Sequence, residues 1–203
     1  DGGANVTERG VVYSTNQNPA ASNSKVTSGN GIGSFTCDLT NLQENTKYYV
    51  RAYAINKKGT SYGEQSSFTT IAYALPTVTT SSATNISYTF ATIGGNVTND
   101  GGTSVTERGV VYSTSQSPTT SNSKVTNGGG TGSFTCNLTN LQENTRYYVR
   151  AYAINKKGTS YGPQASFTTE AYSLPIVTTS SATNISYTSA TIGGNVTNDG
   201  GTS

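Results

Sequence analysis

The sequence is short of the residues and patterns that several classes of function require. It contains no histidine, only two cysteines, and charged residues at 11% of its 203 positions, with a formal net charge of +2. A charge this small does not indicate a nucleic acid or an anionic membrane as partner, since both bind clustered basic residues. No apolar run approaches the roughly 20 residues of a membrane-spanning helix. We therefore expect no nucleic-acid partner and no membrane insertion in this segment.

Catalytic and metal-binding chemistry also lacks its usual residues. The absence of histidine removes the commonest general base and the commonest transition-metal ligand. A calcium site needs several carboxylates among its oxygen ligands, whereas Asp100 stands beside glycines with other acids dispersed. The neighbours Glu107 and Arg108 point to opposite faces of a strand, so we expect a structural role for them, pairing across the sheet with charges such as Arg150. The sequence predicts no enzyme, no catalytic residue, no cofactor and no metal.

What the sequence does contain is typical of β-structure. It has 14 tyrosines, 5 phenylalanines and many valines and threonines, whereas disordered chains are poor in aromatic and β-branched residues. Threonine and serine suit half-buried strands, and the 23 glycines suit the turns that join them. No long window shows the period of a helix. The chain is therefore predicted to be all-β.

Near-identical segments repeat along the chain at an offset of 99 residues. They are 1–19 and 100–118, 47–63 and 146–162, and 78–89 and 177–188. This period is longer than a solenoid or propeller repeat and matches a self-sufficient β-sandwich. The predicted domains are a partial module at 1–70, a complete module at 76–174 and a partial module at 175–203. Because Asp1 does not begin a signal peptide, we expect the chain to be internal to a longer one.

The complete module offers seven strand candidates. In chain order they are A (78–80 with 86–88), B (91–98), C (105–113), C′ (124–126), E (132–140), F (147–155) and G (160–169). In strand E, Phe134, Cys136 and Leu138 alternate with polar residues, so their side chains are predicted to share the core face. The partial modules supply strands C to G before this module and strands A and B after it.

The corner between strands E and F carries a family resemblance. The segment from Leu141 to Tyr147, LQENTRY, resembles the E–F corner of fibronectin type III domains, and Leu42 and Tyr48 repeat it. The longer string YYVRAYAINKKGTSYG resembles divergent type III-like modules of secreted and cell-surface Bacteroidota proteins. The resemblance implies tandem seven-stranded immunoglobulin-like sandwiches, in which the hydroxyl of each corner tyrosine hydrogen-bonds to upstream backbone. Strand B departs from the family, with Ile93 in place of the usual core tryptophan.

The two cysteines occupy one position in two repeats. Cys37 and Cys136 stand 99 residues apart, so no module has an internal disulfide and no zinc site forms from them. The Phe-x-Cys-x-Leu alternation predicts a buried and inert thiol, because free cysteine behaves as a small apolar residue. A disulfide between molecules is the alternative.

Two surfaces are candidates for contact with a partner. Lysines occupy the hairpin tip between strands F and G in both repeats, at Lys57, Lys58, Lys156 and Lys157. Sandwich modules often carry ligand contacts on such loops, and a solvated turn is the alternative. On strand F, the alternating Tyr148, Arg150 and Tyr152 are predicted to form an exposed stripe that contacts glycans or a partner. Cross-strand packing is the alternative for that stripe.

The junctions between repeats connect the fold to a function. Residues 71–74 and 170–173 contain no Gly/Ser run, each contains a tyrosine able to wedge between modules, and a Leu-Pro pair follows each. These features predict a semi-rigid rod that grows by about 35 Å per module. Such a rod suits a repeat segment of a long extracellular, cell-surface filament or adhesin stalk. Its partners would be neighbouring modules or copies of itself, with surface glycans or a host or abiotic surface at the adhesive contacts.

Two alternatives remain open. The modules could be spacers in a secreted multidomain enzyme, in which case a catalytic domain lies elsewhere in the gene. The chain could also be a short subunit of a fibre, in which strands A and B of one chain complete the sandwich of the next by strand complementation.

Overall fold

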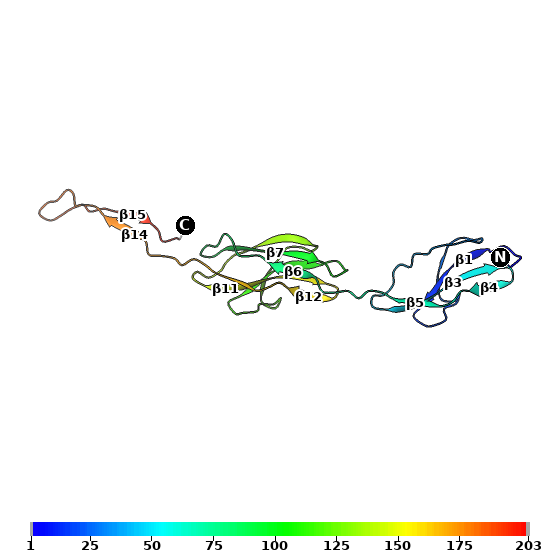
Figure 1. Ribbon diagram of the computed structural model, residues 1–203. Coiled ribbons are helices and arrows are strands. Elements are labelled where there is room, and N and C mark those ends of the chain that lie inside the picture. Colours follow the sequence, from blue (N-terminus) through cyan, green and yellow to red (C-terminus); the bar gives the residue numbers. More distant parts are fainter. Residues whose placement is uncertain (1, 202–203) are drawn as a thin grey trace. The chain divides into compact units, whose positions relative to one another are not determined.

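A computed structural model describes residues 2–201 of the chain (Figure 1). The chain divides into two compact units, Asp1–Tyr73 and Ala74–Ser203. The second unit contains a complete two-layered sandwich followed by a hairpin, and the first contains a single sheet.

The sandwich of the second unit consists of two antiparallel sheets. One has the order β10-β7-β6 and the other has the order β12-β11-β8-β9, with β13 also paired to β11. The strands are β6 (Thr77–Thr80), β7 (Ala91–Asn99), β8 (Glu107–Ser113), β9 (Ser123–Thr126), β10 (Gly132–Leu138), β11 (Arg146–Asn155), β12 (Gly158–Tyr161) and β13 (Ala165–Thr168). In the lettering used above, the sheets are A-B-E and C′-C-F-G, with strand G split in two. The predicted all-β fold of seven-stranded, fibronectin type III-like sandwiches is confirmed.

Side chains that alternate along the strands fill the space between the two sheets. On β10, Phe134, Cys136 and Leu138 are buried and the residues between them are exposed. They join Ile93 of β7 and Val149 of β11 in one apolar core. Because successive side chains of a strand point to opposite faces, this alternation gives each sheet one core face and one outer face.

The two sheets approach each other closely at Gly95 of β7. A Cβ at this position would lie 2.5 Å from Ala151 Cβ and 2.6 Å from the carbonyl oxygen of Thr79. Glycine is therefore required here for steric reasons. A hydrogen bond also crosses between the sheets, since the backbone N–H of Ala151 donates to Thr80 Oγ1 at 2.9 Å.

Two predicted strands differ from the observed ones. Residues 86–88 were expected to continue strand A, but the chain turns there: the Ser87 N–H donates to the Phe90 carbonyl at 2.9 Å, and Asn85 has a left-handed φ of 49°. Strand G is interrupted at 162–164. The Gly162 N–H still donates to the Ala151 carbonyl. The next residue, Pro163, has no N–H to donate to a neighbouring strand.

The first unit contains one sheet, which repeats the C′-C-F-G sheet. Its order is β2-β1-β3-β4, with β5 also paired to β3. The strands are β1 (Glu8–Ser14), β2 (Ser24–Thr27), β3 (Lys47–Asn56), β4 (Gly59–Tyr62) and β5 (Ser66–Thr69). Residues 33–39 correspond to β10 in sequence but form no strand. In the sandwich β10 pairs with β7, for example Cys136 with Ile93, and no described strand of the first unit occupies that place.

Strands β14 (Ile176–Thr179) and β15 (Gly194–Asn198) form a separate two-stranded sheet in the second unit. They repeat β6 and β7, including the register shift after their first pair. Every residue of both strands is exposed. The compact units divide the chain once, after Tyr73, so the separate module expected at 175–203 stays a prediction.

Candidate interaction surfaces

The hairpin tip between β11 and β12 is shaped by a buried asparagine. Asn155 Oδ1 accepts hydrogen bonds from the N–H groups of Lys157 at 2.8 Å and Gly158 at 3.2 Å. Its Nδ2 donates to the carbonyl oxygens of Ala74 and Asp100, both at 2.7 Å. These four bonds fix the tip beside the segment that enters the module.

The lysines predicted as contact residues stand on these tips and are exposed. Lys156 and Lys157 extend from the tip of the sandwich, and Lys57 and Lys58 occupy the same place in the first unit. In the first unit the Lys58 N–H is again held by the asparagine side chain, at 2.8 Å from Asn56 Oδ1. Each tip presents two cations on a turn whose backbone is held in place, an arrangement suited to anionic or hydroxyl-rich partners.

The stripe predicted on β11 is not exposed along its length. Tyr148 and Arg150 are half-buried, whereas Tyr152 is 0% exposed, so the expectation that Tyr152 is available to a partner is wrong. Lys124 from β9 covers its ring, with Nζ 5.9 Å from the ring centroid. Arg150 is also engaged, because its guanidinium lies 4.6 Å over the Tyr161 ring and its Nε donates to the Gly162 carbonyl at 3.0 Å.

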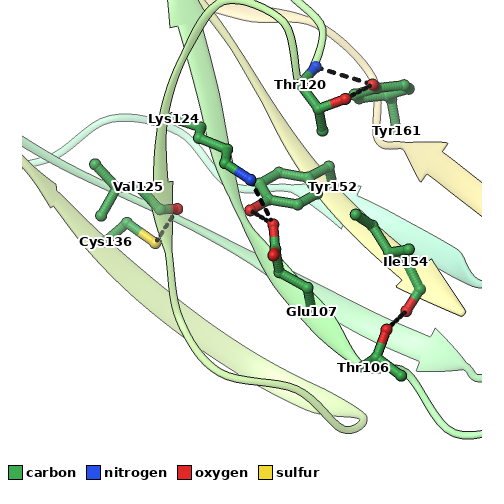
Figure 2. A network of polar contacts seen from close by, with 9 residues as sticks. All are labelled: Thr106, Glu107, Thr120, Lys124, Val125, Cys136, Tyr152, Ile154 and Tyr161. Carbon is green, nitrogen blue, oxygen red and sulfur yellow. Dashed lines mark hydrogen bonds and ion pairs between the residues drawn. The ribbon is translucent and has the colours of Figure 1, made fainter.

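A carboxylate on the outer face of the sheet joins three strands. Figure 2 shows the carboxylate of Glu107 on β8 reached by both the Tyr152 hydroxyl of β11 and the Lys124 ammonium of β9. The Tyr152 hydroxyl donates to Glu107 Oε1 at 2.6 Å, and Lys124 Nζ lies 2.9 Å from the same oxygen. The hydrogen bond from Tyr152 and the one from Lys124 hold the pKa of Glu107 below its ordinary value. Burial and the bond to Glu107 raise the pKa of Tyr152.

The same triad occurs in the first unit. The Tyr53 hydroxyl donates to Glu8 Oε1 at 2.6 Å, and Lys25 Nζ lies 2.7 Å from that oxygen. Burial and the bond to Glu8 raise the pKa of Tyr53 to about 12. The sequence predicted that Glu107 pairs with charges such as Arg150, whereas its partner is Lys124. The strand candidate at 124–126 did not reveal this, because Lys124 stands opposite Val111 in the register and not opposite Glu107.

The second charge of the Glu-Arg pair anchors a loop. Arg108 donates from Nη1 to the carbonyl oxygens of Thr131 at 2.7 Å and Gly132 at 3.1 Å, and from Nε to that of Asn127 at 3.3 Å. Its guanidinium also lies 5.1 Å from the centroid of the Phe134 ring. Arg108 therefore holds the loop that leads into β10, which is a structural task.

The tyrosine of each E–F corner hydrogen-bonds to the backbone five residues upstream. Tyr147 Oη accepts a bond from the Gln142 N–H at 2.9 Å, and Tyr48 Oη accepts one from the Gln43 N–H at 3.0 Å. The hydroxyl is the acceptor in both. Leu141 is buried beside the first corner, whereas Leu42 is only half-buried beside the second.

The two cysteines have different surroundings. Cys136 is 4% exposed in the core, its Sγ lies 3.5 Å from the Val125 carbonyl oxygen, and burial raises the pKa of the thiol. Cys37 lies 3.5 Å from the Val26 carbonyl oxygen but is only half-buried. The difference follows from the paired β7, which covers Cys136 and has no counterpart over Cys37.

The segment that leaves the sandwich is held in place. Glu143 Oε2 accepts a bond from the Tyr172 N–H at 2.6 Å, and the Glu170 N–H donates to the Ser87 carbonyl at 3.2 Å. The Tyr172 ring stacks on Tyr88, with centroids 4.5 Å apart and planes 17° apart. The wedging of this tyrosine between modules stays a prediction, since the Tyr172 side chain is 41% exposed. What the structure shows is its stacking on Tyr88 and the carboxylate of Glu143 that binds its backbone.

The hairpin that follows is attached to the same junction. The Ser173 N–H donates to the Gly200 carbonyl at 2.9 Å. Gly201 lies so close to Tyr88 that a Cβ there would be 2.2 Å from its hydroxyl oxygen. The turn after β15 therefore rests against Tyr88, and glycine is what permits this approach.

Two faces within residues 2–201 expose apolar side chains whose counterparts in the sandwich are buried. On the hairpin, the exposed apolar side chains include Ile176, Val177, Ile192 and Val196. On the first sheet, Phe68 is 37% exposed and Ala52 is exposed. Contiguous apolar patches on a protein surface often mark sites of interaction with another molecule.

Among residues 2–201, no three His, Cys, Asp or Glu side chains lie close enough together to hold a metal ion. In the same residues, no helix has the length and apolarity needed to cross a bilayer.

No protein-family model and no curated protein matches this chain. Its backbone is similar to that of several solved β-sandwich proteins at low identity. The two-domain fibronectin type III segment of chicken tenascin has a TM-score of 0.41 at 17% identity, with 82% of this chain and 87% of that one covered. The FN1–FN3 domains of chicken CNTN1 have a TM-score of 0.39 at 19% identity, with 80% of this chain covered and about half of that one (54%). The sensor domain of the anti-sigma factor RsgI4 from Pseudobacteroides cellulosolvens has a TM-score of 0.36 at 19% identity over 48% of this chain and 97% of that one.

Proposed function

We propose that this chain is a repeat segment of a long extracellular filament or adhesin stalk at a cell surface, with a structural and adhesive role and no catalysis. It would belong to the divergent type III-like repeats of secreted and surface Bacteroidota proteins that its E–F corner resembles. In such a stalk the function of each module is to add length and to transmit load to the next.

The observation that carries this proposal is the ordered junction after the sandwich. A flexible linker would leave residues 170–173 without partners, but here the N–H of Tyr172 is bound by Glu143 and its ring is stacked on Tyr88. The next hairpin is bound to the same segment through Ser173 and Gly200. A repeat joined in this way restricts bending between its modules, which is what a stalk needs and what a freely jointed spacer lacks.

The 99-residue repeat supports the same proposal. Residues 76–174 would form the complete module, with 1–70 and 175–203 as parts of its neighbours. Because neighbouring repeats are nearly identical, the same kind of junction would recur at each step, and a stalk of any number of modules would have uniform stiffness.

The adhesive contacts are proposed on the exposed tips. Lys57, Lys58, Lys156 and Lys157 offer cations at the tips, and the half-buried Tyr148 and Arg150 offer an aromatic and a guanidinium surface farther from the tip, on β11. Their partners would be surface glycans or an abiotic or host surface. Tyr152 is removed from this set because it is fully buried.

The proposal is tested by length and by location. Small-angle scattering of arrays that carry two, three and four copies of the repeat should give a maximum dimension that rises by about 35 Å per copy with a constant cross-section. A rise with only the square root of copy number indicates a flexible chain and contradicts the stalk. Antibodies raised against residues 1–203 should label intact cells of the source organism, and labelling that requires permeabilised cells contradicts the extracellular role.

A further inference from the structure

We propose that a second copy of this chain is a binding partner: the β14–β15 hairpin of one molecule closes over the β1–β5 sheet of another and completes a sandwich between them. This inference deepens the proposed function, and rests on it, by naming the surfaces through which segments of a stalk join. The partner is identified by the structure itself, because residues 77–168 show the same two halves already closed on each other.

The hairpin is the donor surface. Ile93 and Val97 of β7 are each 1% exposed in the closed sandwich, whereas the matching Ile192 and Val196 are 64% and 62% exposed. Val78 of β6 is 7% exposed and its counterpart Val177 is 61% exposed. Between 177 and 198 the hairpin differs from 78–99 at one position, Ser189 in place of Phe90, so it retains the face that is buried in the sandwich.

The first sheet is the acceptor surface. Ala151 is 0% exposed and Phe167 is 6% exposed in the closed sandwich, whereas Ala52 is exposed and Phe68 is 37% exposed. The core residues of the acceptor are identical to those of the closed module. They are Phe35, Cys37, Leu39, Val50, Ala52, Ala54 and Phe68, which match Phe134, Cys136, Leu138, Val149, Ala151, Ala153 and Phe167.

Residues 33–39 supply the edge to which the hairpin would bind. In the sandwich β10 pairs along its full length with β7, with Phe134 opposite Gly95 and Cys136 opposite Ile93. The corresponding 33–39 segment forms no strand, so its backbone is available for a new antiparallel pairing with residues 190–196 of another molecule. Main-chain hydrogen bonds along this edge would give affinity, and the buried apolar side chains would give register.

The steric details also match. Gly95 is required where β7 meets Ala151, and Gly194 stands at the same position in the hairpin opposite the small Ala52. A Cβ on Gly162 would meet Thr80, whereas one on its counterpart Gly63 would meet only Ala52. The groove that strand A fills in the sandwich is therefore open in the first unit.

This contact joins two different surfaces, so it is head-to-tail. Each molecule carries one donor and one acceptor, and association continues into open chains or closes into rings. Sedimentation of residues 1–203 over a range from micromolar to millimolar concentration should show growth beyond dimers. The thiol of Cys37 should lose its reactivity as the oligomers form, because residues 190–196 of the second copy would cover it as β7 covers Cys136.

Two variants block one surface each. Ile192→Asp places a carboxylate on the buried face of the donor, and Ala52→Asp places one on the acceptor; each should weaken association about 100-fold, since an unpaired charge would be buried. Thr197→Asp is the matched control, because its counterpart Thr98 is exposed in the closed sandwich, and it should assemble as the unaltered chain does. Amide exchange in β11 should be unchanged in all three, which shows that the sandwich remains folded.

Mixing the two blocked variants gives the decisive measurement. Ile192→Asp retains a functional acceptor and Ala52→Asp a functional donor, so an equimolar mixture should form one-to-one dimers that grow no further. A chain that stays monomeric at millimolar concentration with a reactive Cys37 overturns the proposal, and so does a mixture that forms no dimer. A monomer with a protected Cys37 indicates closure within one molecule and overturns the second copy as partner. None of these results decides the stalk function, which is tested separately by the array dimensions and the cell-surface labelling.

Discussion

At the scale of single residues, Tyr152 combines a buried ring with a polar bond on the outer face of its sheet. The ring is covered by Lys124 and by the β8 backbone at Gly109, where a Cβ would lie 3.0 Å from the tyrosine ring. The hydroxyl donates to Glu107 at 2.6 Å. A buried hydroxyl without a partner is costly, so tyrosine, carboxylate and lysine form a set in which each member depends on the others.

Replacing this tyrosine by phenylalanine tests the hydroxyl alone. Tyr152→Phe keeps the ring and removes the bond to Glu107, which is partly exposed, so we expect a loss of about 1 kcal/mol in the unfolding free energy of the sandwich. Native-state amide exchange should show a roughly five-fold loss of protection in β11. Tyr148→Phe is the control on the same face of the strand, and an equal effect there would contradict the role given to the Tyr152 hydroxyl.

The low pKa of Glu107 predicts sensitivity to acid. Its bonds from Tyr152 and Lys124 lower the pKa in the folded state below the ordinary value of 4.5, so the carboxylate stabilises the fold above that pH and the contribution is lost as pH falls below it. Glu107→Gln has no such titration. The difference in unfolding free energy between the unaltered chain and this variant should therefore be largest near neutral pH and shrink below pH 4.5. A difference that is constant with pH would show that the carboxylate charge is not what matters.

At the scale of elements, strand E shows what the sequence could and could not predict. The alternation of Phe, Cys and Leu is the same in 35–39 and 134–138, yet only β10 is a strand. Alternation indicates which face would be buried, but a strand forms only where a neighbour takes up its backbone hydrogen bonds. The burial of Tyr152 was missed for a similar reason, because its cover comes from β9, a strand distant in sequence. The repeat, the fold class and the tyrosine corners could be predicted because their signals are local or periodic.

The thiols report on this difference between elements. Cys136 is 4% exposed with a raised pKa, whereas Cys37 is half-buried beside the unpaired 33–39 segment. At low protein concentration a thiol reagent such as DTNB should react with Cys37 faster than with Cys136, and both should react fully in denaturant. The variants Cys37→Ala and Cys136→Ala show which thiol gives the fast phase of the DTNB reaction and which gives the slow phase. Equal rates in the native chain would mean that the edge of strand E is covered in both units.

Arg108 determines how the loop before β10 is held. Its guanidinium donates to three successive carbonyl oxygens, those of residues 130 to 132, and lies over the Phe134 ring. Lysine cannot reproduce this planar set of donors. We expect Arg108→Lys to reduce the unfolding free energy of the sandwich by about 1–2 kcal/mol, with the largest loss of amide protection in β10. Arg146→Lys is the control, since Arg146 is exposed at the start of β11, and it should cost less than about 0.5 kcal/mol.

At the scale of the whole molecule, the repeat acquires its properties from the junction as much as from the sandwich. The absence of glycine and serine runs predicted a stiff connection, but the partners of the connection lie in loops far along the chain. Glu143 is in the corner before β11, and Tyr88 is in the turn before β7. A sequence of one repeat cannot show that these two loops meet at one end of the sandwich, since their approach depends on how the two sheets are stacked.

Removing the carboxylate at this junction should loosen it without unfolding the module. Glu143→Ala deletes the acceptor of the Tyr172 N–H, so residues 170–173 should change from the order of β11 to that of a mobile linker, while amide exchange within the sandwich stays the same. Nitrogen-15 relaxation measures both: the order parameters of 170–173 should fall from about 0.85 to below about 0.6. Glu170→Ala is the control: it removes a glutamate carboxylate two positions before Tyr172. The backbone bonds of residue 170 to Ser87 and Asn144 remain, so the segment should stay ordered. If residues 170–173 stay ordered in both variants, the junction owes its order to the stacking of Tyr172 on Tyr88. The load path of the proposed stalk then runs through the aromatic pair rather than through Glu143.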